Sequence, residues 1–342
     1  MGAMSDAVPA PSQPPLIALD AMGGDRMPDA AIDGALQAVA AGERVVLVGD
    51  EARLRDALRA RDAELPIAHA GDIIAMEESA GEVRRRKDAS IVVATRLAKA
   101  GEAAAVVSMG HSGATMAAAL LVLGRLPGVE RPAILANVPT KTGFTALIDA
   151  GANADCRPAW LQQFAVMGSV YACAFYGDPN PSVGLMSIGE EEGKGNELVV
   201  EAHALLKATP GVNFHGNVEG RDLLAGTTHV VVADGFTGNV MLKLAEGEAK
   251  VLFGMVRDAL RSSWRAKLGG LLVRPALRRI ADRLDPGTYG AQPLLGVDGY
   301  AFIGHGSADA RAVRNALGTA RRMVDAGVRD RIADGLARLT DA

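Results

Sequence analysis

Cysteine is nearly absent from this sequence: only Cys156 and Cys173 occur among 342 residues. Two thiols cannot build the disulfide framework on which many small secreted domains depend. No apolar run approaches the roughly 20 residues that cross a bilayer, and no secretory signal is visible near the amino terminus. These absences favour a reduced, cytoplasmic protein.

Aromatic residues and an excess of basic charge are also missing. Aromatic residues make up only 4% of the chain although hydrophobic residues reach 49%, so alanine, valine and leucine must supply most of the packing. The formal net charge is −4, which argues against general nucleic-acid binding. We expect the Pro/Ala/Ser-rich residues 1–15 to be disordered and residues 16–342 to form a single α/β domain.

Short apolar runs alternate with helical patterns along the whole chain. The runs are apolar throughout rather than at every second position, which is typical of a mostly parallel sheet covered on both faces. We predict strands at 16–20, 44–49, 66–70, 104–108, 133–138, 144–149, 182–188, 212–218, 229–234 and 300–304, and helices at 28–41, 51–61, 90–100, 115–123, 158–176 and 197–208.

Three familiar ligand-binding motifs are incomplete or missing. Gly189–Lys194 is one residue short of the phosphate loop G-x-x-x-x-G-K-[ST]. The dinucleotide fingerprint G-x-G-x-x-G does not follow the strand at 104–108, although a NAD-linked dehydrogenase of a related fold would not need it. The nucleophile elbow G-x-S-x-G nearly fits at Gly110–Gly113, but Ala114 replaces its second glycine. A serine esterase that uses Ser112 therefore stays a rival hypothesis.

The strand at 104–108 leads through a loop of small residues, Met109–Ala114, into an apolar helix. The first N–H groups of a helix have no internal partner, and the helix dipole favours negative charge there. Ser108, Ser112 and Thr115 add hydroxyl groups, and His111 adds a potential positive charge. The pattern predicts an anion site, although empty turns between a strand and a helix have similar sequences.

Polar side chains follow six predicted strands at the point where each strand ends. Parallel strands end at the same edge of a sheet, where open α/β sheets place their ligands. We therefore expect these side chains to converge on one cleft. They are Asp20, Ser108, Asp149, Lys194, Asp234 and His305.

Residues 247–285 interrupt the alternation of strands and helices. They carry a net charge of +5 in a chain of net −4, and apolar residues recur at every fourth position from 256 to 268. Gly269–Val273 predicts an apolar tip between two helices, the second of which begins at Pro275. Such a hairpin suits a membrane surface, and a pair of core or dimer-interface helices fits equally well.

Six signatures, in this order, resemble the PlsX family of bacterial acyl-acyl-carrier-protein:phosphate acyltransferases. They are Leu19–Asp25 (LDAMGGD), Ser108–Gly113 (SMGHSG), Asp149–Asn153 (DAGAN), Gly189–Gly195 (GEEEGKG), Asp234–Asn239 (DGFTGN) and His305–Ser307 (HGS). The resemblance extends from about Leu16 to the last helix. The family pattern usually has asparagine where His111 and Ser187 stand, and serine where Ala308 stands.

The resemblance implies a Rossmann-like α/β/α sandwich, related to phosphotransacetylases and isocitrate dehydrogenases, with a protruding helical hairpin at 247–285. It implies that phosphate attacks the thioester of acyl carrier protein, which gives an acyl phosphate for phospholipid synthesis. It further implies a homodimer that associates peripherally with an anionic membrane surface, and no cofactor or metal.

The resemblance also assigns candidate site residues. The implied catalytic residues are His111, Lys194, Asp234 and Asn239. The implied substrate- and phosphate-binding residues are Asp20, Gly23, Gly24, Asp25, Ser108, Gly110, Ser112, Gly113, Thr115, Asn196, Gly235, Thr237, Gly238, Lys243 and His305. The basic run Arg84, Arg85, Arg86 and Lys87 is either a solvated face or a docking patch, for an acidic partner such as the carrier protein or for phosphate. The predicted membrane contacts are Trp264, Leu268, Leu271, Leu272 and Val273.

Overall fold

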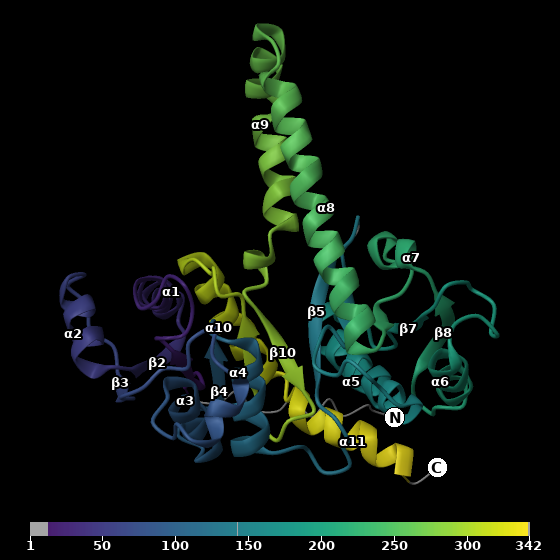
Figure 1. Ribbon diagram of the computed structural model, residues 1–342, viewed down its shortest axis with the longest axis horizontal. Helices are drawn as coiled ribbons and strands as arrows, with labels where there is room; N and C mark the ends of the chain where they lie inside the picture. The colour runs from purple at the N-terminus through teal and green to yellow at the C-terminus, as the bar shows by residue number, and fades with distance from the viewer. Residues whose placement is uncertain (1–12, 142, 341–342) are drawn as a thin grey trace, which may run out of the picture.

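The computed structural model describes residues 13–141 and 143–340, so the predicted disorder of residues 1–12 lies outside the described part of the chain. The strands are β1 (Leu16–Asp20), β2 (Arg44–Gly49), β3 (Ile67–His69), β4 (Ala105–Ser108), β5 (Ala133–Pro139), β6 (Phe144–Ile148), β7 (Ser182–Met186), β8 (Asn213–Val218), β9 (Val230–Val232), β10 (Ala291–Leu295) and β11 (Ala301–Gly304). They form one sheet in the order β3-β2-β1-β4-β11-β10-β5-β6-β9-β7-β8 (Figure 1).

Helices cover both faces of this sheet. They are α1 (Asp29–Ala40), α2 (Glu51–Arg59), η1 (Ala80–Arg84), α3 (Ser90–Lys99), α4 (Ser112–Ala118), η2 (Ala119–Leu123), α5 (Pro158–Tyr176), α6 (Glu197–Lys207), α7 (Gly220–Ala225), α8 (Gly235–Arg261), α9 (Trp264–Leu284), η3 (Pro286–Thr288), α10 (Ala310–Asp325) and α11 (Val328–Thr340).

Successive side chains of a strand point to opposite faces, and in β1 both faces are buried. Ile17 and Leu19 pack in the core on the side of α1, α5 and α10, whereas Ala18 packs on the side of α3 and α4. Helices α7 and α8 cover this second face over β5 and β6. The α/β fold with helices on both faces is therefore confirmed, and it explains why the strands are apolar throughout.

The two halves of the sheet run in opposite directions. Strands β1, β2, β3, β4 and β11 are parallel to one another. Strand β10 is antiparallel to β11 and β5, and β5 is antiparallel to β6. Strands β6, β7, β8 and β9 are again parallel, but they point opposite to β1. We call the edge at the carboxyl ends of β1, β4 and β11 the first edge, and the edge at the carboxyl ends of β6, β7 and β9 the second edge.

The predicted strands are present, with shifts of a few residues at their ends. The sequence pattern does not predict β10, because Pro293 lacks the N–H that a central strand normally donates. It also predicts one helix at 115–123, where α4 begins earlier, at Ser112, and passes into the π-helical η2. Because β10 is antiparallel to both of its neighbours, β5 is again parallel to β11, and the two halves are reversed by the antiparallel pair of β5 and β6.

Helices α8 and α9 lie side by side and project from the body of the molecule (Figure 1). Helix α8 begins at the second edge, crosses the face over β5 and β6, and leaves at the first edge. At the base of this hairpin, Arg311 pairs with Asp285, and the Arg283 guanidinium donates to the Gly143 carbonyl at 3.5 Å.

The predicted apolar tip at Gly269–Val273 is wrong. The chain turns at Ser262 and Ser263, and α9 continues unbroken through the glycine pair and Pro275. The Ser263 hydroxyl caps α9 by accepting a hydrogen bond from the Ala266 N–H at 3.1 Å. This cap starts the second helix before the glycines, which lower helix stability without ending the helix.

Candidate active site

Asp20 lies at the end of β1 and connects two loops at the first edge. Its side chain is buried; one oxygen accepts hydrogen bonds from the N–H groups of Met22 and Gly23, both at 3.2 Å. The other oxygen accepts from the Ser108 hydroxyl at 2.7 Å, and this hydroxyl accepts from the Gly110 N–H at 3.1 Å. Asp20 and Ser108 therefore face the loops that they hold rather than a ligand.

Burial raises the pKa of the Asp20 carboxyl, and hydrogen bonds from Ser90, Ser108 and two backbone amides act in the opposite direction. Ser90 is buried at the start of α3. The sequence pattern does not assign Ser90 to the site, because nothing in the local sequence indicates that α3 starts beneath this loop.

Three glycine-rich loops meet at the first edge through their backbones. A Cβ atom on Gly23 would lie 2.9 Å from the Gly110 Cα, so neither loop has room for a side chain there. Gly24 has a φ of +115°, and its Cβ position is 3.0 Å from the Met109 carbonyl oxygen. The Asp25 N–H donates to the Gly306 carbonyl at 2.8 Å. These loops therefore consist of small residues that pack closely against one another.

His111 is the N-cap of α4. Its Nδ1 accepts a hydrogen bond from the Ala114 N–H at 3.1 Å, which assigns the proton of the neutral ring to Nε2. Thr115 is buried, and its hydroxyl donates to the His111 carbonyl at 3.2 Å. Of the three hydroxyl residues predicted at this loop, only Ser112 is exposed. Asp25 and His305 are also exposed at this edge.

Asp149 organises the second edge as Asp20 organises the first. It is fully buried, and one of its oxygens accepts from the N–H groups of Ile134, Gly151 and Ala152 at 3.0, 3.1 and 2.9 Å. The other oxygen accepts from the Asn153 N–H at 2.7 Å and the Asn153 side-chain amide at 2.8 Å. Burial raises the pKa of this carboxyl, and the hydrogen bonds oppose the increase.

The start of α8 is built against this loop. Asp234 is the N-cap, and its oxygens accept from the Thr237 N–H at 2.9 Å and the Thr237 hydroxyl at 2.7 Å. The Gly235 N–H donates to the Asn153 carbonyl at 2.7 Å. A Cβ on Gly238 would lie 1.9 Å from the Asp149 carbonyl oxygen, so only glycine fits. The predicted site residues at the start of α8 therefore shape the helix start itself; they are Asp234, Gly235, Thr237 and Gly238.

Asn239 and Lys243 are exposed on α8 beyond this start. Lys243 Nζ lies 3.7 Å from a Glu246 carboxylate oxygen. Because α8 rises about 1.5 Å per residue, Lys243 lies roughly 12 Å from the start of the helix, in the direction of the first edge.

Lys194 projects from a loop whose other charged residues are largely paired. Glu190 pairs with Arg221 at 3.2 Å, Glu192 pairs with Lys207 at 2.6 Å, and the Glu191 carbonyl accepts from Asn217 at 2.8 Å. Lys194 is exposed, and no described carboxylate pairs with its amine. Asn196 caps α6 by accepting from the Val199 N–H at 3.0 Å.

The expectation that all six strand ends converge on one cleft is wrong. Asp20, Ser108 and His305 lie at the first edge, and Asp149, Lys194 and Asp234 lie at the second edge. Six strand spacings of about 4.8 Å, roughly 29 Å in total, also separate β4 from β7. One chain therefore does not bring Lys194 and His111 together. The physical reason is the antiparallel pair of β5 and β6, which reverses the direction of β6, β9, β7 and β8. A uniformly parallel sheet would have placed all six ends at one edge.

The basic run between β3 and α3 contains two kinds of side chain. Arg84, Arg85 and Lys87 are exposed. Arg86 instead donates to Asp72 and to both Glu78 oxygens, and its side chain is only 25% exposed. Arg86 is thus an internal ion-pair partner rather than part of a free basic patch.

The described hairpin exposes large apolar side chains. The five predicted membrane contacts, Trp264, Leu268, Leu271, Leu272 and Val273, are all exposed on α9. None of the described helices is long and apolar enough to cross a membrane.

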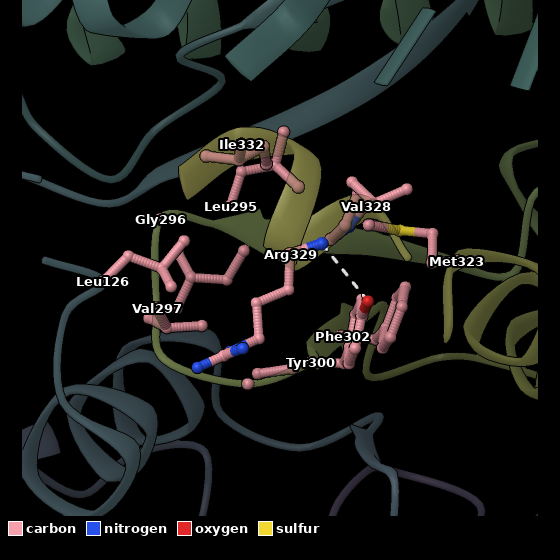
Figure 2. A pocket seen from close by; sticks show the side chains of 14 residues that line it. Leu126, Leu295, Gly296, Val297, Tyr300, Phe302, Met323, Val328, Arg329 and Ile332 are labelled. Carbon is pink, nitrogen blue, oxygen red and sulfur yellow. Dashed lines mark hydrogen bonds between the residues drawn. The ribbon is translucent and has the colours of Figure 1, made fainter. Parts of the chain in front are cut away.

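Two concavities lie away from both loop clusters. One cavity has a volume of about 10 Å³. It is lined mostly by apolar side chains, including Leu126, Phe302 and Ile332 (Figure 2). The Arg329 N–H donates to the Tyr300 hydroxyl at 3.2 Å beside it (Figure 2). A space of this size holds about one water molecule, so it is a packing void and not a substrate site. An open depression of about 620 Å³ lies at the amino ends of β1 and β4, near Lys99 and Arg44.

No described group of histidine, cysteine, aspartate and glutamate side chains is placed to hold a metal ion.

Comparison with known proteins assigns the chain to a family. The family described as "Fatty acid synthesis protein" matches residues 16–331. Phosphate acyltransferase of Thermus thermophilus is 62% identical over 323 residues, which cover 94% of this chain and 99% of that protein. Phosphate acyltransferase of Deinococcus radiodurans is 58% identical over 278 residues, which cover 80% of this chain and 77% of that protein. The chain belongs to the phosphate acyltransferase family. It is an acyltransferase.

Solved structures share the fold at low sequence identity. A phosphotransacetylase of Streptococcus pyogenes matches with a TM-score of 0.61 and 16% identity, over 90% of this chain and 93% of that one. The 4-hydroxythreonine-4-phosphate dehydrogenase of Klebsiella pneumoniae matches with a TM-score of 0.54 and 14% identity, over 93% of this chain and 100% of that one. The relation to phosphotransacetylases that the resemblance implies is therefore confirmed at the level of the fold.

Proposed function

We propose that this acyltransferase moves a fatty acyl group from acyl carrier protein to inorganic phosphate, and that the acyl phosphate product serves phospholipid synthesis. The observation that carries the proposal is the meeting of three glycine-rich loops at the start of α4. Backbone amides at a helix start suit a tetrahedral anion. Relatives named phosphate acyltransferase support phosphate as that anion.

Phosphate would bind at the first edge. Asp20 and Ser108 would act as positioning residues, because their side chains are buried and bonded to the loops. The groups available for contact are the Ser112 hydroxyl, the His111 Nε2–H and the His305 ring, together with the backbone of Gly24 and Gly113. The N–H groups of Gly23 and Gly110 already donate to Asp20 and Ser108.

The chemistry needs positioning more than it needs an activated side chain. A phosphate oxygen attacks the thioester carbonyl carbon, the C–O bond forms, and the carbonyl electrons move to oxygen. The tetrahedral intermediate then collapses, the C–S bond breaks, and the thiolate takes the proton that the attacking hydrogen phosphate carried. Phosphate is already anionic, and a thiol with a pKa of about 8.5 is a fair leaving group. The site must hold the reactants in line and stabilise the oxyanion.

The second edge would serve a different anion. Lys194 is an exposed cation without a described carboxylate partner, and it lies on a loop fixed by ion pairs. The carrier's pantetheine group contains a phosphodiester, which is a suitable partner for such a cation. We assign Lys194 to that anion, with Asn239 and Lys243 on the helix that runs from there toward the first edge.

The partner surfaces follow from exposed side chains. Arg84, Arg85 and Lys87 form a basic patch beside the first edge that suits an acidic carrier protein. Phe236, Val240 and Leu244 of α8 are 67, 51 and 67% exposed and recur every four residues, which suits a second copy of the chain in a homodimer.

The exposed apolar side chains and arginines of α9 suit an anionic membrane surface. The acyl tail of the product is insoluble in water, so release at a bilayer makes chemical sense. On this proposal the enzyme works in the cytoplasm and associates peripherally with the membrane.

The serine-esterase alternative has less support. His111 is the residue adjacent to Ser112, and its Nδ1 already accepts the capping hydrogen bond of α4. No described histidine accepts a hydrogen bond from the Ser112 hydroxyl. The dehydrogenase alternative rests on the shared fold alone.

Release of the carrier thiol with and without phosphate tests the proposal. We expect release to require phosphate and to survive Ser112→Ala with less than a roughly tenfold loss, because no acyl-serine forms. Equal release without phosphate, or complete loss in Ser112→Ala with the trapping of an acyl-enzyme in the wild type, would establish the hydrolase instead.

A further inference from the structure

The segment at residues 72–89, which we call the clasp, joins β3 to α3 beside the first edge. Its two ends are hydrogen-bonded to each other. The Asp72 N–H donates to the Asp88 carbonyl at 3.2 Å, and the Ser90 N–H donates to the Asp72 carbonyl at 2.9 Å. Ser90 then contacts Asp20, so the end of the clasp is joined directly to the phosphate-site loops.

Arg86 closes the clasp from within. Its Nε donates to Asp72 at 2.5 Å, and one terminal nitrogen donates to the second Asp72 oxygen. The other terminal nitrogen donates to both Glu78 oxygens, at 2.7 and 2.6 Å. Glu78 also accepts from the Ala75 N–H at 2.7 Å. The planar guanidinium fork thus binds two carboxylates of the clasp at once, which a point charge cannot do equally well.

Met76, which lies between these two carboxylates, and Ala80, the first residue of η1, touch two loops of the candidate phosphate site. A Cβ on Gly306 would lie 3.1 Å from Met76 Cε, and a Cβ on Gly113 would lie 3.1 Å from Ala80 Cβ. Val83 anchors the clasp in the core, where it is 1% exposed. Any shift of the clasp would therefore move the side chains of Ala80 and Met76, which pack beside Gly113 and Gly306.

We infer that Arg86 is a positioning residue for phosphate: it holds the clasp against the loops of the first edge and takes no part in carrier docking. This inference rests on the proposed function. The inferred role of Arg86 differs from that of its neighbour Arg85, which is free to contact a partner. Arg85 is 83% exposed, and its closest carboxylate, Glu82, is 3.7 Å away.

Two substitutions in the same basic run test the inference. Arg86→Lys keeps the charge and removes the fork, and we expect it to raise the KM for phosphate roughly tenfold or more with the KM for the acyl carrier within about twofold. Arg85→Gln removes an exposed charge, and we expect it to raise the KM for the carrier with the KM for phosphate unchanged. Arg55→Lys is the control for shortening an arginine, because Arg55 is exposed and pairs with Glu51 within helix α2, outside the clasp.

Folding is checked by circular dichroism and thermal unfolding. If Arg86→Lys does not fold, Glu78→Gln removes only one arm of the clasp and should also raise the KM for phosphate. Folded Arg86→Lys and Glu78→Gln enzymes with a wild-type KM for phosphate would overturn the inference, as would a rise confined to the KM for the carrier. A wild-type enzyme whose turnover needs no phosphate would instead refute the proposed function itself, before any variant is compared.

Discussion

At the scale of single residues, the two most buried carboxylates of the loop clusters determine loop shape. Asp20 and Asp149 each accept several hydrogen bonds from backbone amides of their own loop. A sequence motif that contains an aspartate and glycines does not show whether the aspartate binds a ligand or holds its own loop in place. The structure does, because the Asp149 carboxylate has no exposed surface.

Asp149→Asn should therefore act on stability. The new amide would present N–H groups to the Asn153 donors that now bind the carboxylate, and buried unsatisfied donors cost about 1–3 kcal/mol each. We expect the free energy of unfolding in urea to fall by about 3 kcal/mol. The control is Asp155→Asn, at an exposed position of the same loop. It should change the free energy of unfolding by less than about 0.5 kcal/mol. Equal effects of the two substitutions would show that Asp149 is not an anchor.

Asp72 gives a stability effect that depends on pH. Hydrogen bonds from Arg86 hold the pKa of the Asp72 carboxyl below its ordinary value of 3.8, although burial acts in the opposite direction. A carboxyl with a lowered folded-state pKa stabilises the fold above its unfolded pKa, and this stabilisation is lost as the pH falls through the lowered value. At pH 7 the free energy of unfolding of the wild type should exceed that of Asp72→Asn by no more than about 1 kcal/mol, because the Asp72–Arg86 ion pair is partly exposed.

The difference between wild type and Asp72→Asn should shrink toward zero as the pH falls from about 4 to below the lowered pKa. Urea unfolding at several pH values measures it. Asp56→Asn is the control, because that carboxylate is 76% exposed in its pair with Arg59. A difference that grows at low pH would contradict the assigned ion pair.

At the scale of elements, the sequence predicted most strands and helices but not how the two halves of the sheet are oriented. Apolar runs and Gly/Pro punctuation mark where each element lies. The direction of a strand depends on its neighbours, and the composition of the predicted strands at 133–138 and 144–149 does not show that they pair antiparallel. The six motifs were therefore recognised correctly as loops after strands, whereas their division between two edges required the structure.

This division gives Lys194 a specific prediction. Lys194→Ala should lower kcat/KM for the acyl carrier by roughly 10²-fold, in line with the loss of one preorganised electrostatic contact, and leave the KM for phosphate unchanged. Lys207→Ala is the control, since its amine already pairs with Glu192 at 2.6 Å. A rise in the KM for phosphate would indicate that Lys194 contacts phosphate. Because Lys194 and the first edge are far apart within one chain, the two parts of the site would then have to come from different chains.

At the scale of the whole molecule, the hairpin is the part that extends beyond the α/β body (Figure 1). Four exposed aliphatic side chains on α9 would contribute at most roughly 1.5–3 kcal/mol each on burial in a bilayer. Arginines near anionic lipid would add up to about 1 kcal/mol each, and salt would weaken this part. Apolar contact should thus dominate.

Leu271→Glu combined with Leu272→Glu should release the protein from anionic liposomes. Both side chains are exposed, at 65 and 79%, so the α/β body and activity on soluble acyl carrier protein should survive. Liposome sedimentation and the oligomeric state of the variant are measured together. A variant that still sediments, or that dissociates into inactive monomers, would make the hairpin a packing or dimer element.

Direct attack by phosphate is the central claim, and the transfer of an oxygen atom tests it most directly. Purified enzyme is given acyl carrier thioester and phosphate labelled with oxygen-18, and the product is analysed by mass spectrometry. The account predicts a hydroxylamine-reactive acyl phosphate in which the oxygen joining carbon to phosphorus carries the label. Unlabelled free fatty acid, formed at the same rate without phosphate, would contradict it.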